Sequence, residues 1–205
     1  METKLWEVIC LSPPKTIRYC KKCGKKTEYV SSGMFRVNAQ QKSVDIWLIY
    51  RCANCKTTWN ATIFSRINPK SIAPALLNKF MENDHALAEQ YAMDTELLKK
   101  NGAETETPSY RVLGDAVDLT KDTQLRITSK YPLKIKAAKV LREKLSITNT
   151  VFNQMAASGA IRLENGADIH KCKLQRKLVV CIRAAAISFS EISNVGGNEN
   201  AKSCP

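Results

Sequence analysis

The chain reads Cys20-Lys21-Lys22-Cys23-Gly24, and 28 residues separate Cys23 from a second pair, Cys52-Ala53-Asn54-Cys55. A CxxC turn directs two thiolates to one centre, and two such turns complete a tetrahedral site with metal–sulfur distances of about 2.3 Å. Gly24 suits the first turn, because backbone that curls round a metal often needs positive φ. The spacing predicts one structural Zn²⁺ bound by Cys20, Cys23, Cys52 and Cys55. Four protein thiolates leave no open coordination position, so catalysis at this metal is not expected.

Two other interpretations of these cysteines compete with zinc. A thioredoxin-like redox site needs one CxxC at the start of a helix, whereas both pairs here lie beside expected strands. Disulfides are disfavoured in the cytoplasm, where we expect the chain to reside. Its first residues lack the regions of a signal peptide, and no run approaches the roughly 18 apolar residues of a membrane helix. We therefore expect no membrane partner.

The composition describes a globular chain with an excess of positive charge. Its 205 residues are 44% hydrophobic and 25% charged, which excludes collagen, coiled coil and wholesale disorder. The net charge of +13 favours a polyanionic partner, although solubility alone also explains a basic protein. Residues 1–70 hold 13 basic and 4 acidic side chains, residues 71–118 hold 4 and 9, and residues 119–205 hold 15 and 6. The acidic middle segment either separates two basic modules or packs against them.

Strand patterns surround the cysteines, and helix patterns follow. Residues 34–38 and 44–50 read as a hairpin, and residues 58–63 as a third strand, which predicts a three-stranded zinc ribbon with four cysteine ligands over residues 1–70. Short helices over residues 71–102 would cover it: Pro74 opens the first, Asn83 or Asp84 caps the second, and Asp94 caps the third. Residues 103–118 read as a polar linker.

Basic residues stand next to aromatic ones in the ribbon. Arg18-Tyr19, Phe35-Arg36 and Tyr50-Arg51 could stack nucleic-acid bases, or the rings could fill a small core.

These residues resemble a known bacterial family. The resemblance rests on Cys20-x-x-Cys23-Gly24-Lys25-Lys26-Thr27-Glu28, residues 35–39, Trp47 to Cys52, Cys55, residues 58–60 and Asn83-Asp84. The chain is similar to proteins catalogued as domain of unknown function 1062, most strongly over residues 15–101. The resemblance implies a zinc ribbon and brings no established activity.

The C-terminal module, residues 119–190, reads as α/β, with two helices plus short strands. A strand at residues 125–127 precedes helices over residues 136–145 and from Ser146 or Thr148 to Gly159, and strands at residues 161–163 and 178–182 follow. The order helix, turn, helix, strand, loop, strand resembles, over residues 133–183, the RNA-binding domain of ribosomal protein S-four and pseudouridine synthases. Residues 191–205 are expected to be a disordered tail.

The second resemblance implies that RNA is held by basic side chains on the first helix and at the start of the second. Asn149 and Asn153 depart from it, because arginine or lysine is usual there. A solvated basic face on a helix that merely packs is the alternative. The candidate nucleic-acid-binding residues are Lys134, Lys136, Lys139, Arg142, Lys171, Lys173, Arg176 and Lys177.

The sequence thus predicts an α+β protein that is not an enzyme and binds RNA through phosphate contacts. The alternative is a protein-interaction adaptor that docks a partner on the ribbon and the acidic helical segment. The chain has no phosphate-cradling glycine loop, no nucleophile elbow and two histidines, so no small-molecule substrate is inferred.

Overall fold

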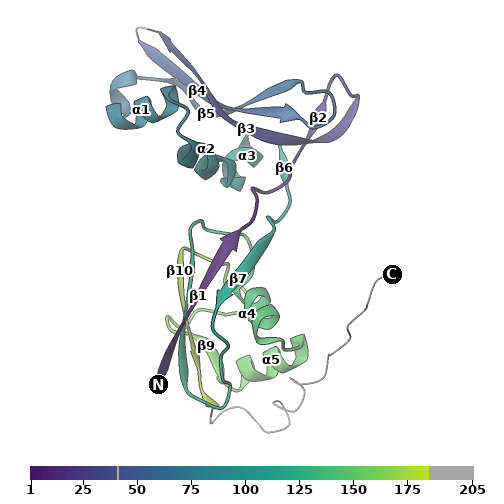
Figure 1. Cartoon of the computed structure of the whole chain (residues 1–205), viewed down its shortest axis with the longest axis vertical. Coiled ribbons are helices and arrows are strands. Elements are labelled where there is room, and N and C mark those ends of the chain that lie inside the picture. The colour runs from purple at the N-terminus through teal and green to yellow at the C-terminus, as the bar shows by residue number, and fades with distance from the viewer. Residues whose placement is uncertain (41, 185–205) are drawn as a thin grey trace. The chain divides into compact units, whose positions relative to one another are not determined.

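The computed structural model describes residues 1–40 and 42–184 and divides the chain into two compact units. Unit 2 is continuous, from Cys10 to Ser109, whereas unit 1 combines Met1–Ile9 with the chain from Tyr110 onwards. Each unit holds one five-stranded sheet, and the described residues form five α-helices, so the fold is mixed α+β (Figure 1). No helix in the described ranges is long and apolar enough to cross a membrane.

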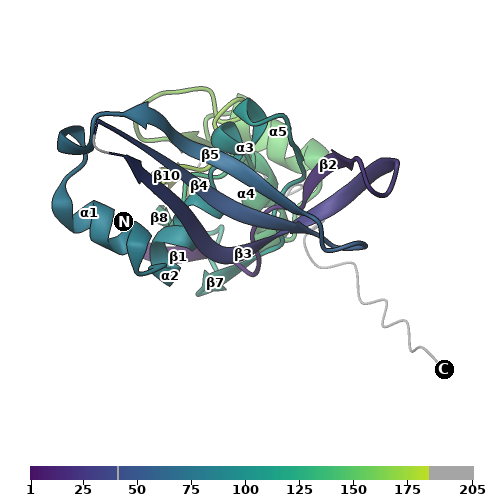
Figure 2. The ribbon, with the colours of Figure 1, turned by 90° about the horizontal axis from the view of Figure 1, so that it is seen from above.

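The sheet of unit 2 is antiparallel and has the strand order β5-β4-β3-β2-β6. Its long strands β3, β4 and β5 lie side by side in Figure 2. On β4 the buried residues alternate from Val44 to Cys52, as expected of a sheet with one face on the core. The strands are β2 (Thr16–Cys20), β3 (Lys25–Gln40), β4 (Ser43–Cys52), β5 (Thr58–Ile67) and β6 (Glu104–Thr105).

Three helices cover the buried face of this sheet: α1 (Pro74–Met81), α2 (His85–Ala92) and α3 (Thr95–Lys100), with a 3-10 turn at Pro69–Ser71 before them. The Asp84 and Asp94 carboxylates cap α2 and α3 by accepting backbone N–H bonds in the first turn. Phe80 is fully buried at the centre of the core, and its ring lies 4.8 Å from that of Phe35, edge to face. These contacts fix the helices on the sheet.

Unit 1 has the strand order β7-β1-β8-β10-β9 with α4 and α5. Strand β1 pairs in parallel with β8, and β10 pairs antiparallel with both β8 and β9. Thr148 caps α5 by accepting from Val151 N. The elements are β1 (Glu2–Cys10), β7 (Tyr110–Gly114), β8 (Thr123–Ser129), α4 (Ala137–Leu145), α5 (Asn149–Ala157), β9 (Ile161–Leu163) and β10 (Lys177–Ile182).

The structure corrects three parts of the sequence prediction. The first sheet has five strands and not three, because β2 and β6 extend it. Residues 1–9, assigned to the ribbon, form β1 of unit 1, and residues 103–118, assigned to a linker, contain β6 and β7. β1, β6 and β7 pair with segments far away in the sequence, which local patterns do not reveal, whereas β2 also pairs with the neighbouring β3 and was missed locally. The predicted disordered tail, residues 191–205, lies outside the described residues.

Candidate metal centre and basic surface

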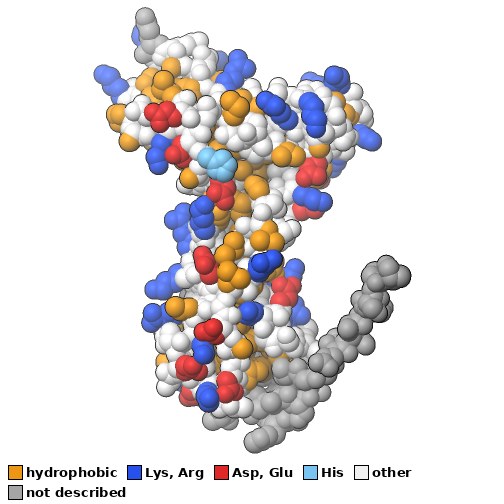
Figure 3. All heavy atoms as spheres, viewed as in Figure 1, with side chains coloured by type: hydrophobic (Ala, Val, Ile, Leu, Met, Phe, Trp, Pro, Cys, Tyr) orange, Lys and Arg blue, Asp and Glu red, His pale blue; other side chains and the backbone are white. Residues whose placement is uncertain are grey.

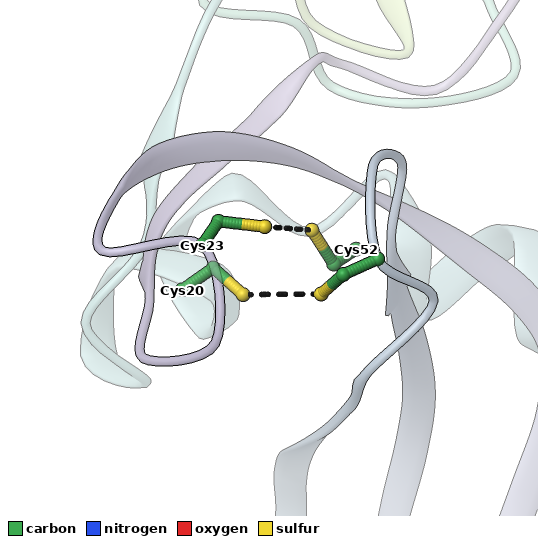
Figure 4. A group of neighbouring side chains, drawn as sticks. Cys20, Cys23 and Cys52 are labelled. Carbon is green, nitrogen blue, oxygen red and sulfur yellow. Dashed lines mark hydrogen bonds between the residues drawn. The ribbon is translucent and has the colours of Figure 1, made fainter.

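The four predicted cysteines converge at one end of the unit 2 sheet. Their sulfur atoms all lie within 4.8 Å of one another. The Cys20 and Cys55 Sγ atoms are 3.5 Å apart, and those of Cys23 and Cys52 are 3.9 Å apart. Figure 4 shows the side chains of Cys20, Cys23 and Cys52 pointing into the space between the two turns.

This arrangement fits a tetrahedral ion. Four sulfurs at about 2.3 Å from a metal are separated by about 3.8 Å from one another. The two sulfur–sulfur distances of 3.5 and 3.9 Å lie close to that value. The four cysteines can therefore hold a metal ion, and an all-thiolate donor set suits soft or borderline ions.

Two similar turns position the ligands. The first joins β2 to β3, and the Gly24 N–H donates to Cys20 O at 2.9 Å. The second joins β4 to β5, and the Lys56 N–H donates to Cys52 O at 3.0 Å. The residue after each pair has positive φ, +68° at Gly24 and +62° at Lys56, which confirms the expectation for Gly24. Lysine at the second position adopts a backbone conformation that favours glycine.

Hydroxyl groups surround the sulfurs. The Thr27 Oγ1 lies 3.2 Å from Cys52 Sγ in a buried position, and the Thr57 Oγ1 lies 3.2 Å from Cys55 Sγ in an exposed one. Hydrogen bonds from the Cys55 backbone amide and the Thr27 hydroxyl lower the pKa of Cys52 to about 6. The Tyr29 hydroxyl lowers the pKa of Cys20. The hydrogen bonds that Cys52 and Cys20 accept stabilise their thiolates and orient them toward a metal.

Sequence reasoning missed Thr27 and Tyr29. Both are buried positions of β3 on either side of the half-buried Glu28, and they share the buried face of the strand with the cysteine cluster. The register of β3 on β2 and β4, which places Tyr29 opposite Cys52, is the signal that would have found them.

In unit 1 the structure brings together two of the candidate basic segments. Lys136 and Lys173 are antiparallel partners in an isolated bridge. Ala137 N donates to Cys172 O at 2.9 Å and Leu174 N donates to Ile135 O at 2.8 Å, one on each side of the bridge. The two lysines therefore occupy a non-hydrogen-bonded position, where opposite side chains stand closest. Both are exposed on the same side of the pair.

Lys134, two residues before Lys136, is also exposed. We call the surface formed by Lys134, Lys136 and Lys173 the basic bridge. Like charges placed directly opposite each other destabilise a strand pair, so the fold tolerates repulsion at this point.

The remaining candidate residues of this unit have other surroundings. Lys139 forms a 3.7 Å ion pair with Glu143 and lies over the Tyr110 ring, whose hydroxyl also donates to Glu143. Arg142 is half-buried, with its Nε inaccessible to solvent. Lys171 pairs with Asp168 at 3.7 Å. Arg176 and Lys177 are exposed at the start of β10.

Comparison with known proteins identifies a family. A family model described as "Protein of unknown function (DUF1062)" matches residues 37–167, more than half of the chain. The match includes Cys52 and Cys55 and begins after Cys20 and Cys23. No curated protein and no solved structure matches the chain.

Proposed function

The chain belongs to the DUF1062 family, and we propose that this member is a non-enzymatic RNA-binding protein with a structural zinc ion. Zinc is the proposed ion because it prefers tetrahedral thiolate sites and has no redox chemistry of its own. Bound at Cys20, Cys23, Cys52 and Cys55, it would join the β2–β3 turn to the β4–β5 turn. Its role would be to stabilise unit 2, because all four coordination positions are filled by protein.

The observation that carries the RNA proposal is the pairing of Lys136 with Lys173. The basic bridge gathers ammonium groups from two segments onto one exposed side, where they can contact successive phosphates. Like-charge repulsion that persists in the folded state is typical of a functional surface. The order α4, α5, β9, β10 is also that of the RNA-binding domain which residues 133–183 resemble, and this favours RNA over DNA.

A charge reversal at Lys173 tests the proposal. Lys173→Glu replaces a repulsive cross-strand pair with an attractive one, so we expect a slightly more stable fold, by about 0.2–1 kcal/mol. The same change should weaken binding to a structured RNA by at least about 10-fold and reduce the salt dependence of binding. Arg162→Glu is the matched control, because Arg162 is an exposed residue of β9 and the charge change is identical.

Fluorescence anisotropy at several salt concentrations measures the affinity, and urea unfolding measures the stability. Equal affinities for the Lys173→Glu and Arg162→Glu variants would remove the basic bridge as an RNA surface. Affinity for a protein partner that survives nuclease treatment and ignores ionic strength would instead favour the adaptor function.

A further inference from the structure

A second group of basic residues surrounds the cysteine cluster in unit 2. Lys21 and Lys22 lie between Cys20 and Cys23, Lys25 begins β3, Arg51 precedes Cys52, and Lys56 follows Cys55. All five are exposed. The four sulfurs lie within 4.8 Å of one another, so the turns that carry these residues meet at one end of the sheet. Figure 3 shows Lys and Arg side chains gathering over the β2 end of unit 2.

An exposed aromatic ring completes this group. Tyr19 precedes Cys20 on β2 and is 57% exposed, whereas Phe35 and Tyr50, the other aromatic residues that stand next to a basic residue in the predicted ribbon, are buried in the core. Tyr19 and Cys20 point to opposite faces of the sheet, so the ring stands on the face away from the core. We call Tyr19, Lys21, Lys22, Lys25, Arg51 and Lys56 the knuckle surface.

The charge of the knuckle surface exceeds what the metal site needs. Four thiolates on a divalent ion carry a formal charge of about −2. Residues 16–28 and 51–58 contain one acidic residue, Glu28, and Lys26 is paired with Glu104. Within the described residues, Lys21, Lys22 and Lys25 have no carboxylate within ion-pair distance. The surplus positive charge therefore faces solvent and suits a polyanion.

Lys56 adds a separate observation. Gly24 and Lys56 occupy equivalent positions in the two turns, both with positive φ. A lysine there accepts backbone strain that glycine avoids, while its Nζ donates to Ala53 O at 2.8 Å and stays exposed. Lys56 therefore retains a positive charge at a position where glycine would give a more stable backbone. This is expected where the charge has a function.

We propose that the knuckle surface binds single-stranded nucleic acid, with its lysines on phosphates and Tyr19 stacked on a base. Flexible strands present both groups together, because unpaired bases expose their faces to aromatic side chains while the backbone stays within reach of ammonium groups. This surface belongs to unit 2 and shares no residue with the basic bridge of unit 1.

The test uses the metal-loaded full chain and three labelled probes: oligouridine and oligothymidine of about 16 nucleotides, and an RNA duplex of similar length. Lys21→Gln with Lys22→Gln should lower the slope of log affinity against log salt on both single strands by about 1.4, since each phosphate contact contributes about 0.7. The control is Lys70→Gln with Lys79→Gln, which removes two exposed charges at the α1 end of unit 2. It should leave the slope unchanged.

The Tyr19 variants test stacking separately. Tyr19→Ala should weaken single-strand binding about 10-fold and spare the duplex, and Tyr19→Phe should restore it because the ring is retained. The proposal would be overturned if the Lys21/Lys22 and Lys70/Lys79 double variants showed equal slopes of log affinity against log salt. A Tyr19→Ala variant that binds single strands like the parent would also overturn it. Stronger binding of oligouridine than of oligothymidine would identify RNA as the partner. Equal binding would show that the partner can be single-stranded RNA or DNA.

The two proposals fail in different ways. If Lys173→Glu weakens binding and the knuckle variants do not, the basic bridge stands and the knuckle surface is refuted. The reverse result refutes the basic bridge alone. Circular dichroism and metal content of each variant establish that an effect on binding does not come from unfolding.

Discussion

The hydrogen bond between Thr27 and Cys52 should control how tightly the metal is held. The Thr27 Oγ1 lies 3.2 Å from Cys52 Sγ, and Thr27 is buried, so no water can replace the hydroxyl if it is removed. Thr27→Val keeps the shape of the side chain and deletes that donor. A hydrogen bond to a charged group contributes about 1.5–3 kcal/mol, which corresponds to a roughly 10- to 100-fold loss of metal affinity.

The molecule contains its own control for this prediction. The Cys55 thiol donates to Thr57 Oγ1 at the same distance, 3.2 Å, and this contact is exposed, so water can take the place of the Thr57 hydroxyl. Thr57→Val should therefore change the affinity by less than about 3-fold. Thr27→Ser keeps the hydroxyl and should bind metal like the parent.

Competition with a chromophoric chelator at neutral pH measures the affinity for Zn²⁺. A second readout is the unfolding free energy at fixed free metal, which should fall by about 1.4 kcal/mol for each tenfold loss of affinity. Equal affinities for Thr27→Val and Thr57→Val would show that burial does not strengthen the Thr27 bond and would refute the reasoning.

Three further predictions concern acid, a strand edge and a close backbone contact. Metal affinity should rise between about pH 6 and 8, because the pKa of Cys23 is raised to about 12, mainly by its hydrogen bond with Cys55, and this thiol must release a proton on binding. The pKa of Cys52 is lowered to about 6, so this thiol is mostly ionised by the upper end of that range and then releases few protons. Calorimetry in buffers of different ionisation enthalpy counts the protons, and none released would contradict this. Asn101→Ala should lower the unfolding free energy of unit 2 by about 2–4 kcal/mol, because the Asn101 side chain makes two hydrogen bonds to the Thr62 backbone and one to Leu97 O; a loss below about 1 kcal/mol in urea unfolding would count against it. Gly114→Ala should lower the Tm more than Gly166→Ala, because both glycines have positive φ but a Cβ at Gly114 would also lie 2.2 Å from Leu5 O, whereas one at Gly166 would have no neighbour within 4 Å; equal shifts would contradict it.

Features with local causes were predicted well from the sequence. Asp84 and Asp94 cap helices because their carboxylates reach backbone N–H groups two or three residues away. The cysteine cluster follows from spacing for the same reason, since each turn sets the direction of two thiols. The sequence left either Asn83 or Asp84 as the N-cap of α2. In the structure Asp84 caps the helix, and the Asn83 side chain accepts a hydrogen bond from Phe35 N.

Features that depend on distant pairing were missed. Strand β1 pairs with β8, and a strand whose partner lies more than 100 residues away carries no local signal of that pairing. The basic bridge shows the same limit. Lys136 and Lys173 were each predicted as candidates, but their opposition requires the segment before α4 to pair with the loop before β10.

The two units are related by insertion, which explains why contiguous domain boundaries failed. Unit 1 requires residues from both sides of unit 2, and Trp6 and Val8 of β1 are almost fully buried in it. The chain enters and leaves unit 2 at neighbouring points, because Leu11 N donates to Ser109 O at 2.9 Å. An inserted domain with adjacent ends disturbs its host little.

The family match, residues 37–167, begins in unit 2 and ends in unit 1, so it covers part of each unit and does not include β1. A fragment that starts after Ser109 would lack β1, the strand between β7 and β8. The basic bridge must therefore be studied in the full chain, whereas residues 10–109 should fold alone once their metal is supplied.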